Sequence, residues 1–391
     1  MDKGLFLAVK LMIRLQNKKK CCGCSACASV CPKSCIAMVC DDEGFLYPSV
    51  DESVCINCHL CEKVCPFLNY SNSIKKVKVS AAISADLETR LNSSSGGVFN
   101  ELAKNVISQG GCVFGAAFVD DWSVEHCMVE DVESLSKLRK SKYVQSWIGN
   151  TYRKAKSQLL QGRIVLFTGT SCQIAGLKHF LRKDYNNLVT VEILCHGVPS
   201  SKVWRLYLKE YLHGKGYDMK DVCKLSFRDK VKGQTEYKLS IMMNDNVCLS
   251  HFFYEDPYMK GFLSNLTLRP SCYSCMAKGG KSGSDIVLGD LWNKYTQEPF
   301  NDSNGTNVVL TNTPKGIELL KKCNLVIADI GDTGIDYYKN SGFQRKQFVS
   351  PYRDKFFMEM GKGNIIHLLN KYSEIPIYWR MIRRIKRILK I

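Results

Sequence analysis

Two stretches near the N-terminus decide the first part of the fold: residues 21–32 read CCGCSACASVCP, and residues 55–66 read CINCHLCEKVCP. Each contains a quartet of cysteines separated by two, two and three residues and ends in Cys-Pro, and the first stretch has a fifth cysteine, Cys22. The 391-residue chain has 20 cysteines, and 11 of them lie between residues 21 and 65. Such a number is compatible with disulfides, zinc sites or iron–sulfur clusters, and the spacing decides among them.

The repeated spacing is typical of bacterial two-cluster ferredoxins. Three thiolates at intervals of three residues surround one cubane only where the chain folds tightly, and small residues such as Gly23 and Ala26 permit that approach. The fourth cysteine of each run precedes a proline and reaches the other cluster. We therefore assign the first [4Fe-4S] cluster to Cys21, Cys24, Cys27 and Cys65, and the second to Cys55, Cys58, Cys61 and Cys31.

A pair of zinc knuckles is the alternative to these clusters. Zinc sites use four ligands in two pairs, whereas this chain has two complete quartets that each end in Cys-Pro. Cys22, Cys35 and Cys40 are left over, and Cys22 competes with Cys21 for the first position, although the spacing favours Cys21. Because such clusters move one electron each, we expect a downstream centre that uses those electrons.

The rest of the chain predicts one large mixed domain. Residues 77–85 resemble a strand, and a helix with Val98, Leu102 and Val106 on one face begins at residues 96–97 and ends at 110–111. Residues 112–119 and 123–129 predict antiparallel strands, and the apolar runs 163–169 and 188–194, separated by a helix over 172–182, predict a βαβ unit.

The expected organisation is therefore α+β, a small ferredoxin domain followed by a mixed α/β domain. A polar linker, residues 69–76, separates the two. We predict these segments: a basic N-terminal segment 1–20, the two-cluster ferredoxin domain 21–68, the mixed α/β domain 77–350, and a helical basic tail 351–391.

Two loops of the larger domain have the chemistry of a binding site. Residues 93–97 (SSSGG) combine hydroxyls with unhindered amides at a helix start, which suits a cofactor phosphate, although an ordinary serine N-cap gives the same pattern. Residues 168–173 (TGTSCQ) form a strand-to-helix turn, where α/β folds place cofactors, and a plain tight turn is the alternative.

Four later cysteines form a third group. Cys172, Cys195, Cys272 and Cys275 all lie at turns or element ends, and four thiols are the count for a further [4Fe-4S] cluster. The alternatives are buried structural thiols, zinc, or a nucleophilic pair of Cys195 and His196, whose adjacent side chains would point to opposite faces of a strand. Five further cysteines are predicted to be core residues: Cys112, Cys127, Cys223, Cys248 and Cys323.

Seven short motifs occur in order between residues 20 and 350, and together they resemble one family. They are residues 94–97 (SSGG), 142–146 (KYVQS), 169–178 (GTSCQIAGLK), 195–200 (CHGVPS), 227–230 (FRDK), 269–272 (RPSC) and 284–292 (SDIVLGDLW). Together they resemble the coenzyme F-420 hydrogenase/dehydrogenase beta-subunit family, whose relatives include 7-hydroxymethyl chlorophyll a reductase. The sequence departs from the family at Ser171, where proline is common, and at Asn293, where glycine often stands.

The resemblance implies an FAD-dependent oxidoreductase in which iron–sulfur clusters exchange single electrons with the flavin. It implies that the late cysteines hold the family's cluster beside the flavin. It also implies a set of flavin-binding residues: Ser95, Gly96, Gly97, Gly169, Thr170 and Gln173, with Tyr143 and Gln145 nearby. No catalytic residue is assigned.

The substrate implied is either a deazaflavin-type coenzyme or another small organic molecule, with a redox partner protein as electron donor or acceptor. The alternative is an electron-transfer subunit that relays electrons to a partner enzyme without binding a substrate. The net charge of +18 raises nucleic-acid binding as a third class, but no nucleic-acid motif accompanies the charge, so we expect none.

Much of the excess charge lies at the two ends. Residues 377–391 (IYWRMIRRIKRILKI) contain six Lys or Arg and no acid, and at helical spacing their apolar side chains share one face. Such a helix fits an anionic membrane surface, and docking on the protein or on a partner is the alternative. Reduced thiols and the lack of a credible signal peptide point to the cytoplasm, with peripheral contact at the inner face of the membrane.

We expect deletion of residues 376–391 to release the protein from anionic liposomes, because the deletion removes the basic amphipathic segment. Liposome co-sedimentation measures the binding, and iron content serves as the control and should not change. Unchanged sedimentation would contradict the membrane hypothesis.

Overall fold

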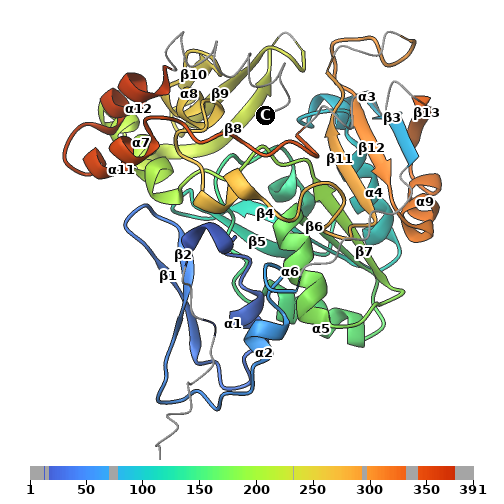
Figure 1. The fold of residues 1–391 in the computed structure, drawn as a ribbon. Coiled ribbons are helices and arrows are strands. Elements are labelled where there is room, and N and C mark those ends of the chain that lie inside the picture. Colours follow the sequence, from blue (N-terminus) through green and yellow to red (C-terminus); the bar gives the residue numbers. More distant parts are fainter. Residues whose placement is uncertain are drawn as a thin grey trace, which may run out of the picture.

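The computed structural model describes residues 13, 17–69, 78–231, 233–292, 297–331 and 342–374. Its N-terminal domain places two short helices and one hairpin around the cysteine-rich segments (Figure 1). The hairpin strands pair antiparallel, with Ile36 opposite Val50. The elements are the 3-10 helix η1 (Lys18–Lys20), α1 (Ala26–Val30), β1 (Ile36–Cys40), β2 (Leu46–Val50) and α2 (Leu60–Lys63).

The helices α1 and α2 begin in the same way, each shortly after the second cysteine of its quartet. Their N-cap residues Ser25 and His59 both adopt a left-handed backbone, with φ of 61° and 58°. This uncommon conformation reverses the chain sharply, so that the third cysteine of each quartet turns back toward the first two. The duplicated motif thus folds as a duplicated structure.

The larger domain is built on an eight-stranded sheet in the order β13-β3-β12-β11-β7-β6-β4-β5. Its strands are β3 (Lys78–Ser84), β4 (Cys112–Phe118), β5 (Val124–Val129), β6 (Val165–Thr170), β7 (Leu188–Ile193), β11 (Ile286–Asp290), β12 (Asn307–Thr311) and β13 (Leu325–Asp329). The neighbours β4, β6, β7 and β11 run parallel, and β5 and β12 pair antiparallel at either side. The predicted β4–β5 pair and the βαβ unit are confirmed.

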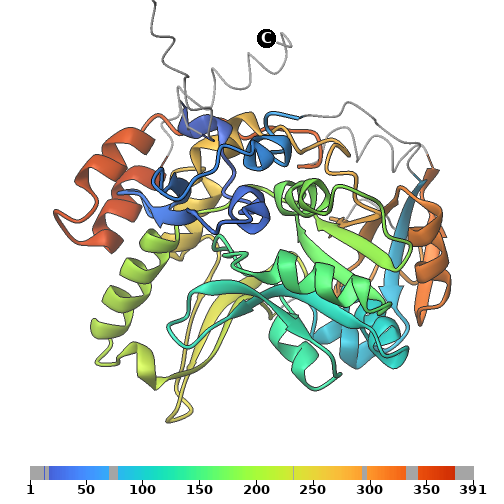
Figure 2. The same cartoon turned by 90° about the horizontal axis from the view of Figure 1, so that it is seen from below.

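Helices cover both faces of this sheet (Figures 1 and 2). On one face, α4 (Val98–Ser108) and α9 (Pro314–Lys321) pack apolar side chains such as Leu102 and Leu320 onto the parallel strands. On the other, α5 (Thr151–Leu160) and α6 (Ser171–Leu181) form a core with Phe167 of β6. The short helix α3 (Leu87–Leu91) follows β3.

A second, three-stranded sheet covers one end of the large sheet. Its order is β10-β9-β8, and buried Trp204 and Phe227 lie at the centre of the core that joins it to the surrounding helices. The elements here are β8 (Val222–Lys230), β9 (Tyr237–Met243), β10 (Cys248–Phe252), α7 (Ser201–His213), α8 (Pro257–Leu263), α11 (Arg353–Glu359), α12 (Ile365–Ser373) and the 3-10 helices η2 (Ser134–Leu138), η3 (Met219–Asp221) and η4 (Pro270–Ser274). In the part of the chain that the structure describes, no helix combines the length and apolarity needed to cross a membrane.

The ferredoxin domain packs on α5 and α6, as both ribbon views show. Arg153 of α5 donates from Nε to the carbonyl of Ser29 at 2.7 Å. On the far side of the interface, Arg353 of α11 forms a two-pronged ion pair with Glu43. These contacts hold the ferredoxin domain against the larger domain.

Gly176 in α6 sets how closely the ferredoxin domain approaches. A Cβ at this position would lie 2.8 Å from Cβ and 3.0 Å from Sγ of Cys24, and 2.8 Å from the hydroxyl of Tyr152. Only a residue without a side chain therefore allows Cys24 to lie against this helix.

We expect Gly176→Ala to lower the free energy of unfolding by about 1–3 kcal/mol, because the added methyl overpacks the interface. Urea unfolding of the anaerobic protein measures this change. Gly214→Ala is the matched control, because a Cβ there meets its nearest atom at 3.4 Å. Equal stability of the two variants would contradict the close approach.

Candidate iron–sulfur and flavin site

The four thiols assigned to the first cluster lie together in the structure. Cys27 interacts electrostatically with Cys21 and Cys65, and Cys24 interacts with Cys27 and Cys65. Burial raises the pKa of the Cys27 thiol to about 12. Burial likewise raises the pKa of Cys65, and such thiols ionise at neutral pH only if cations compensate their charge, which is what bound iron supplies.

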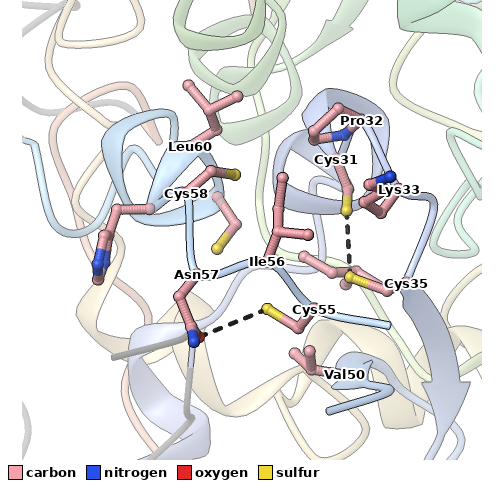
Figure 3. A pocket seen from close by; sticks show the side chains of 13 residues that line it. Cys31, Pro32, Lys33, Cys35, Val50, Cys55, Ile56, Asn57, Cys58 and Leu60 are labelled. Carbon is pink, nitrogen blue, oxygen red and sulfur yellow. Dashed lines mark hydrogen bonds between the residues drawn. The ribbon is translucent and has the colours of Figure 1, made fainter. Parts of the chain in front are cut away.

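The second quartet lines a hollow (Figure 3). Cys31, Cys55, Cys58 and Cys61 all border it, as predicted, and so does a fifth thiol, Cys35. Sγ of Cys35 lies 3.3 Å from Sγ of Cys31, and Cys35 also contacts Cys55. Sequence spacing left Cys35 over because it follows the complete Cys31–Pro32 motif, and the hairpin brings it back to the hollow.

Among the described residues, no three or more His, Cys, Asp or Glu side chains are arranged around a single metal position. A cubane is larger than one ion, so its four ligands surround a wider space than the ligands of zinc do.

The late cysteines meet because two neighbouring strands end level with one another. Thr170, the last residue of β6, pairs with Ile193, the last residue of β7. Cys172 and Cys195 each follow two residues later, at the carboxyl edge of the sheet. Arg269 donates from its backbone N–H to the carbonyl of Val198, which places η4 over the same edge.

All six pairs among Cys172, Cys195, Cys272 and Cys275 interact electrostatically. Burial raises the pKa of Cys272 to about 12 and that of Cys275 to about 11. The predicted grouping of these four residues is therefore present in the structure.

Two buried cations flank this quartet, and each acts on two of its four cysteines. Arg269 lowers the pKa of Cys172 and Cys272, and Lys278 lowers that of Cys195 and Cys275. Both effects are smaller than the opposing effect of burial. The two cations therefore offset part of the cost of forming thiolates, the state of cysteine that binds iron, and the pKa of all four thiols stays raised.

The alternative of a Cys195–His196 nucleophilic pair does not match the geometry. Cys195 faces the other three cysteines, whereas Nε2 of His196 lies 2.7 Å from Oδ1 of Asn265 and its ring contacts Phe262 edge-on. Burial lowers the pKa of His196 to about 4. Cys195 and His196 therefore contact different groups and do not form a nucleophilic pair.

Cys22 connects the first quartet with the late one. Its thiol contacts Cys172 and Cys24, and the three side chains belong to one buried cluster. That contact, ahead of burial, raises the pKa of Cys172 well above its ordinary value. The spacing favours Cys21 over Cys22 for the first cluster, but sequence alone could not place the Cys22 thiol beside a residue 150 positions away.

The loop at residues 93–97 lies where β3 ends and β12 begins. Ser95 donates from Oγ to the carbonyl of Thr306 at 2.8 Å. Gly96 packs so closely on the β3–β12 pair that a Cβ would lie 2.6 Å from the carbonyl oxygen of Ala82. Gly97 has φ of 87° and caps α4 without a side chain. Both glycines are thus required by the backbone.

The turn after β6 is held by a capping box. The backbone N–H of Thr170 donates to Oε1 of Gln173 at 2.9 Å, and Nε2 of Gln173 donates to the carbonyl of Ser146. Gly169 contacts the same side chain, since a Cβ there would lie 3.2 Å from Cβ of Gln173. The residue pattern that suggested a cofactor turn therefore also makes a rigid helix start.

The segment 141–146 runs between these two loops. The N–H of Ser141 donates to Oγ of Ser94 at 2.8 Å, next to the first loop. Tyr143 is deeply packed, with its ring stacked on Phe262 at 4.9 Å. Nε2 of Gln145 donates to the carbonyl of Cys22 at 3.1 Å, which places Gln145 at the ferredoxin interface.

A group of cations lies beside this segment. Arg228 is 3% exposed and donates to Asp290 at 2.5 Å, and its buried Nε has no hydrogen-bond partner among the described residues. Lys230 donates to the carbonyl of Ser95 at 2.8 Å, and burial first, then the charge of Arg228, lowers its pKa to about 7. Lys230 also donates to the carbonyls of Arg90 and Asn304, so the buried Nε of Arg228 is the donor here that suits an acceptor on an anionic group.

Comparison with known proteins identifies both parts of the chain. Residues 162–327 match the family model for the C-terminal part of the beta subunit of coenzyme F420 hydrogenase/dehydrogenase, and residues 20–69 match a 4Fe-4S dicluster domain. Residues 162–327 belong to this beta-subunit family. The resemblance drawn from the seven motifs is confirmed.

Among 13 matching chains of solved structures is one from the xenon-derivatised F420-reducing [NiFe] hydrogenase complex of Methanosarcina barkeri. It is 16% identical, with a TM-score of 0.46, over 76% of this chain and 90% of that one. A comparison with curated proteins found no match. The family matches establish an iron–sulfur electron-transfer protein of an oxidoreductase family.

Several expectations for this beta-subunit relative need adjustment. Cys112 is buried as predicted, but Cys223 and Cys248 are exposed on the second sheet rather than in a core, because their strands leave one side in solvent. Cys127 and Cys323 are half-buried. The departure at Asn293, the linker from residue 70 onward and the tail at 377–391 lie outside the described residues.

Sequence reasoning did not single out His126, which orders the turn after β6. Its Nδ1 lies 2.6 Å from Oγ of Ser146 and its Nε2 lies 2.9 Å from the carbonyl oxygen of Thr168. Burial lowers its pKa from 6.5 to about 4. No motif marks this residue, since a lone histidine in a strand is an ordinary core residue.

We expect the free energy of unfolding to fall by roughly 3 kcal/mol through His126 as the pH drops from 7 to 4, because the unfolded state then binds the proton that the folded state excludes. The stability is fully present above about pH 6.5. His126→Phe should lack this part of the pH dependence in urea unfolding of the metal-free chain. Identical pH profiles for both proteins would contradict it.

Proposed function

We propose that this protein is an FAD- and iron–sulfur-dependent oxidoreductase with two ferredoxin-type [4Fe-4S] clusters and a third at Cys172, Cys195, Cys272 and Cys275. The observation that carries this proposal is the late quartet itself, in which every pair of thiols interacts and which touches the first quartet through Cys22. The four thiols, flanked by Arg269 and Lys278, fit the donor set of a cubane.

In this proposal the ferredoxin domain exchanges electrons with this quartet. The hollow of the second quartet opens toward solvent, since Cys58 is exposed. Cys24 of the first quartet packs against α6 at Gly176. The thiols thus form a series from the surface, through the interface, to the carboxyl edge of the large sheet. A redox partner protein fits at the exposed end of that series.

The flavin fits the edge of the sheet beyond the late quartet. The loop at Ser95, Gly96 and Gly97 and the turn at Gly169, Thr170 and Gln173 both follow parallel strands, so they lie at the same edge. Four strand spacings separate β3 from β6, roughly 19 Å, which suits an extended dinucleotide rather than a single phosphate. Carboxyl edges of such sheets are where α/β folds bind dinucleotides.

The residues between the loops fit the phosphates and the ring. Arg228 supplies positive charge near Ser95, and its Nε, which has no partner among the described residues, is a donor in need of an acceptor. Tyr143 contributes an aromatic surface in the segment that joins the two loops. FAD, when bound, supplies the conversion between one-electron and two-electron transfer.

The substrate of this proposal is a small organic molecule or a deazaflavin-type coenzyme, reduced or oxidised at the flavin. Assembly with a redox partner is part of the proposal, because the exposed side of the second quartet at Cys58 offers a place where electrons can enter or leave the chain.

Anaerobic purification followed by iron, sulfide and flavin quantification on one sample tests the proposal. We expect about twelve irons and one FAD per chain, at four irons per cubane. Cys172→Ser should lose about four irons and keep the ferredoxin clusters, whereas the exposed Cys248→Ser should keep all twelve. About eight irons and no flavin in the unmodified protein would instead indicate an electron relay without a substrate site.

A further inference from the structure

Arg269 is a fully buried residue that reaches the first cysteine quartet from the other domain. Its Nε donates to the carbonyl of Cys21 at 2.8 Å, and one terminal nitrogen donates to the carbonyl of Leu46 at 2.8 Å. The same nitrogen lies 3.8 Å from Sγ of Cys21. A permanent positive charge therefore lies beside a ligand of the first cluster.

The guanidinium is held firmly in this place. Its other terminal nitrogen donates to Oε1 of Gln145 at 3.1 Å, and its centre lies 4.3 Å from the ring centroid of Tyr47. Gln145 in turn donates to the carbonyl of Cys22. The charge has no freedom to move away when the charge of the cluster changes.

The same residue belongs to the segment that carries the late quartet. The backbone carbonyl of Arg269 accepts from the N–H of Cys272 at 2.9 Å, and its charge acts on Cys172 and Cys272. Arg269 is not among the residues that line the hollow of the second quartet. It therefore acts on two of the three thiol groups and leaves the outermost one largely unaffected.

We propose that Arg269 is a positioning residue that raises the reduction potential of the first ferredoxin cluster above that of the second, so that electrons collect at the interface with the late quartet. One electron leaves the second cluster and enters the first, so the second is oxidised, the first is reduced, and no bond forms or breaks. Reduction makes a cluster more negative, and a buried cation stabilises that state. The inference rests on the proposed function only where it assigns a role to the late quartet.

The experiment compares the full-length chain with Arg269→Gln, which removes the charge, and Arg269→Lys, which keeps it. We measure iron content first and then both ferredoxin-cluster potentials by potentiometry with EPR detection. Arg269→Gln should lower one potential by about 59 mV or more, a tenfold change in a one-electron equilibrium, and leave the other unchanged. Arg269→Lys should stay close to the unmodified protein.

Two control variants distinguish an effect of the Arg269 charge from an effect of altered packing between the domains. Glu43→Gln weakens the interdomain ion pair with Arg353 without touching a cysteine, so it should leave both potentials unchanged. Lys278→Gln removes the cation beside Cys195 and Cys275 only, so it should shift the third centre and spare both ferredoxin clusters.

Unchanged potentials in an iron-replete Arg269→Gln protein would overturn the proposal. So would an equal shift in Arg269→Lys or in Glu43→Gln, because the effect would then come from altered packing. If Arg269→Gln does not retain iron, the Arg269→Lys protein decides, since any shift there contradicts a charge effect. A chain with only about eight irons would refute the third cluster while the shift of the first could still be measured.

Discussion

The parallel pairing of β6 with β7 is the constraint on which the rest of the site depends. Thr170 and Ile193 are paired in register at the last rung of the two strands, so the chain leaves both strands at the same level. Cys172 at the start of α6 and Cys195 just after β7 therefore enter the same space. The η4 segment then has only to cover that edge to bring in Cys272 and Cys275.

The second constraint is the close fit of the ferredoxin domain on α6. Gly176 leaves room for Cys24, and Cys22 reaches past it to Cys172. Arg269 completes the contact by binding the ferredoxin backbone at two carbonyls. Because these interactions involve cysteine ligands or their neighbours, domain docking and electron transfer depend on the same residues.

Next to the late cysteines, the carboxyl edge of the sheet carries basic side chains. Arg228 contacts Asp290 at the end of β11, which is the neighbour of β7, and Lys230 and the glycines of residues 96–97 lie further along, near the ends of β12 and β3. The proposed flavin site and the late quartet meet at the turn after β6, where Oγ1 of Thr170 lies 3.3 Å from Sγ of Cys172.

The sequence by itself determined the ferredoxin domain, because a cubane demands four thiols at short and regular spacing and those thiols lie within 45 residues of one another. It also predicted the βαβ unit and the membership of the late quartet, since hydrophobic runs and turn residues mark where strands end. Only the tertiary structure decided the roles of Cys22, Cys35, Arg269 and His126. Each acts through partners that are close in space only after folding, and no local pattern of residues records a contact across 123 or 248 positions. Such contacts are decided by the packing of whole elements rather than by the preferences of the residues that make them.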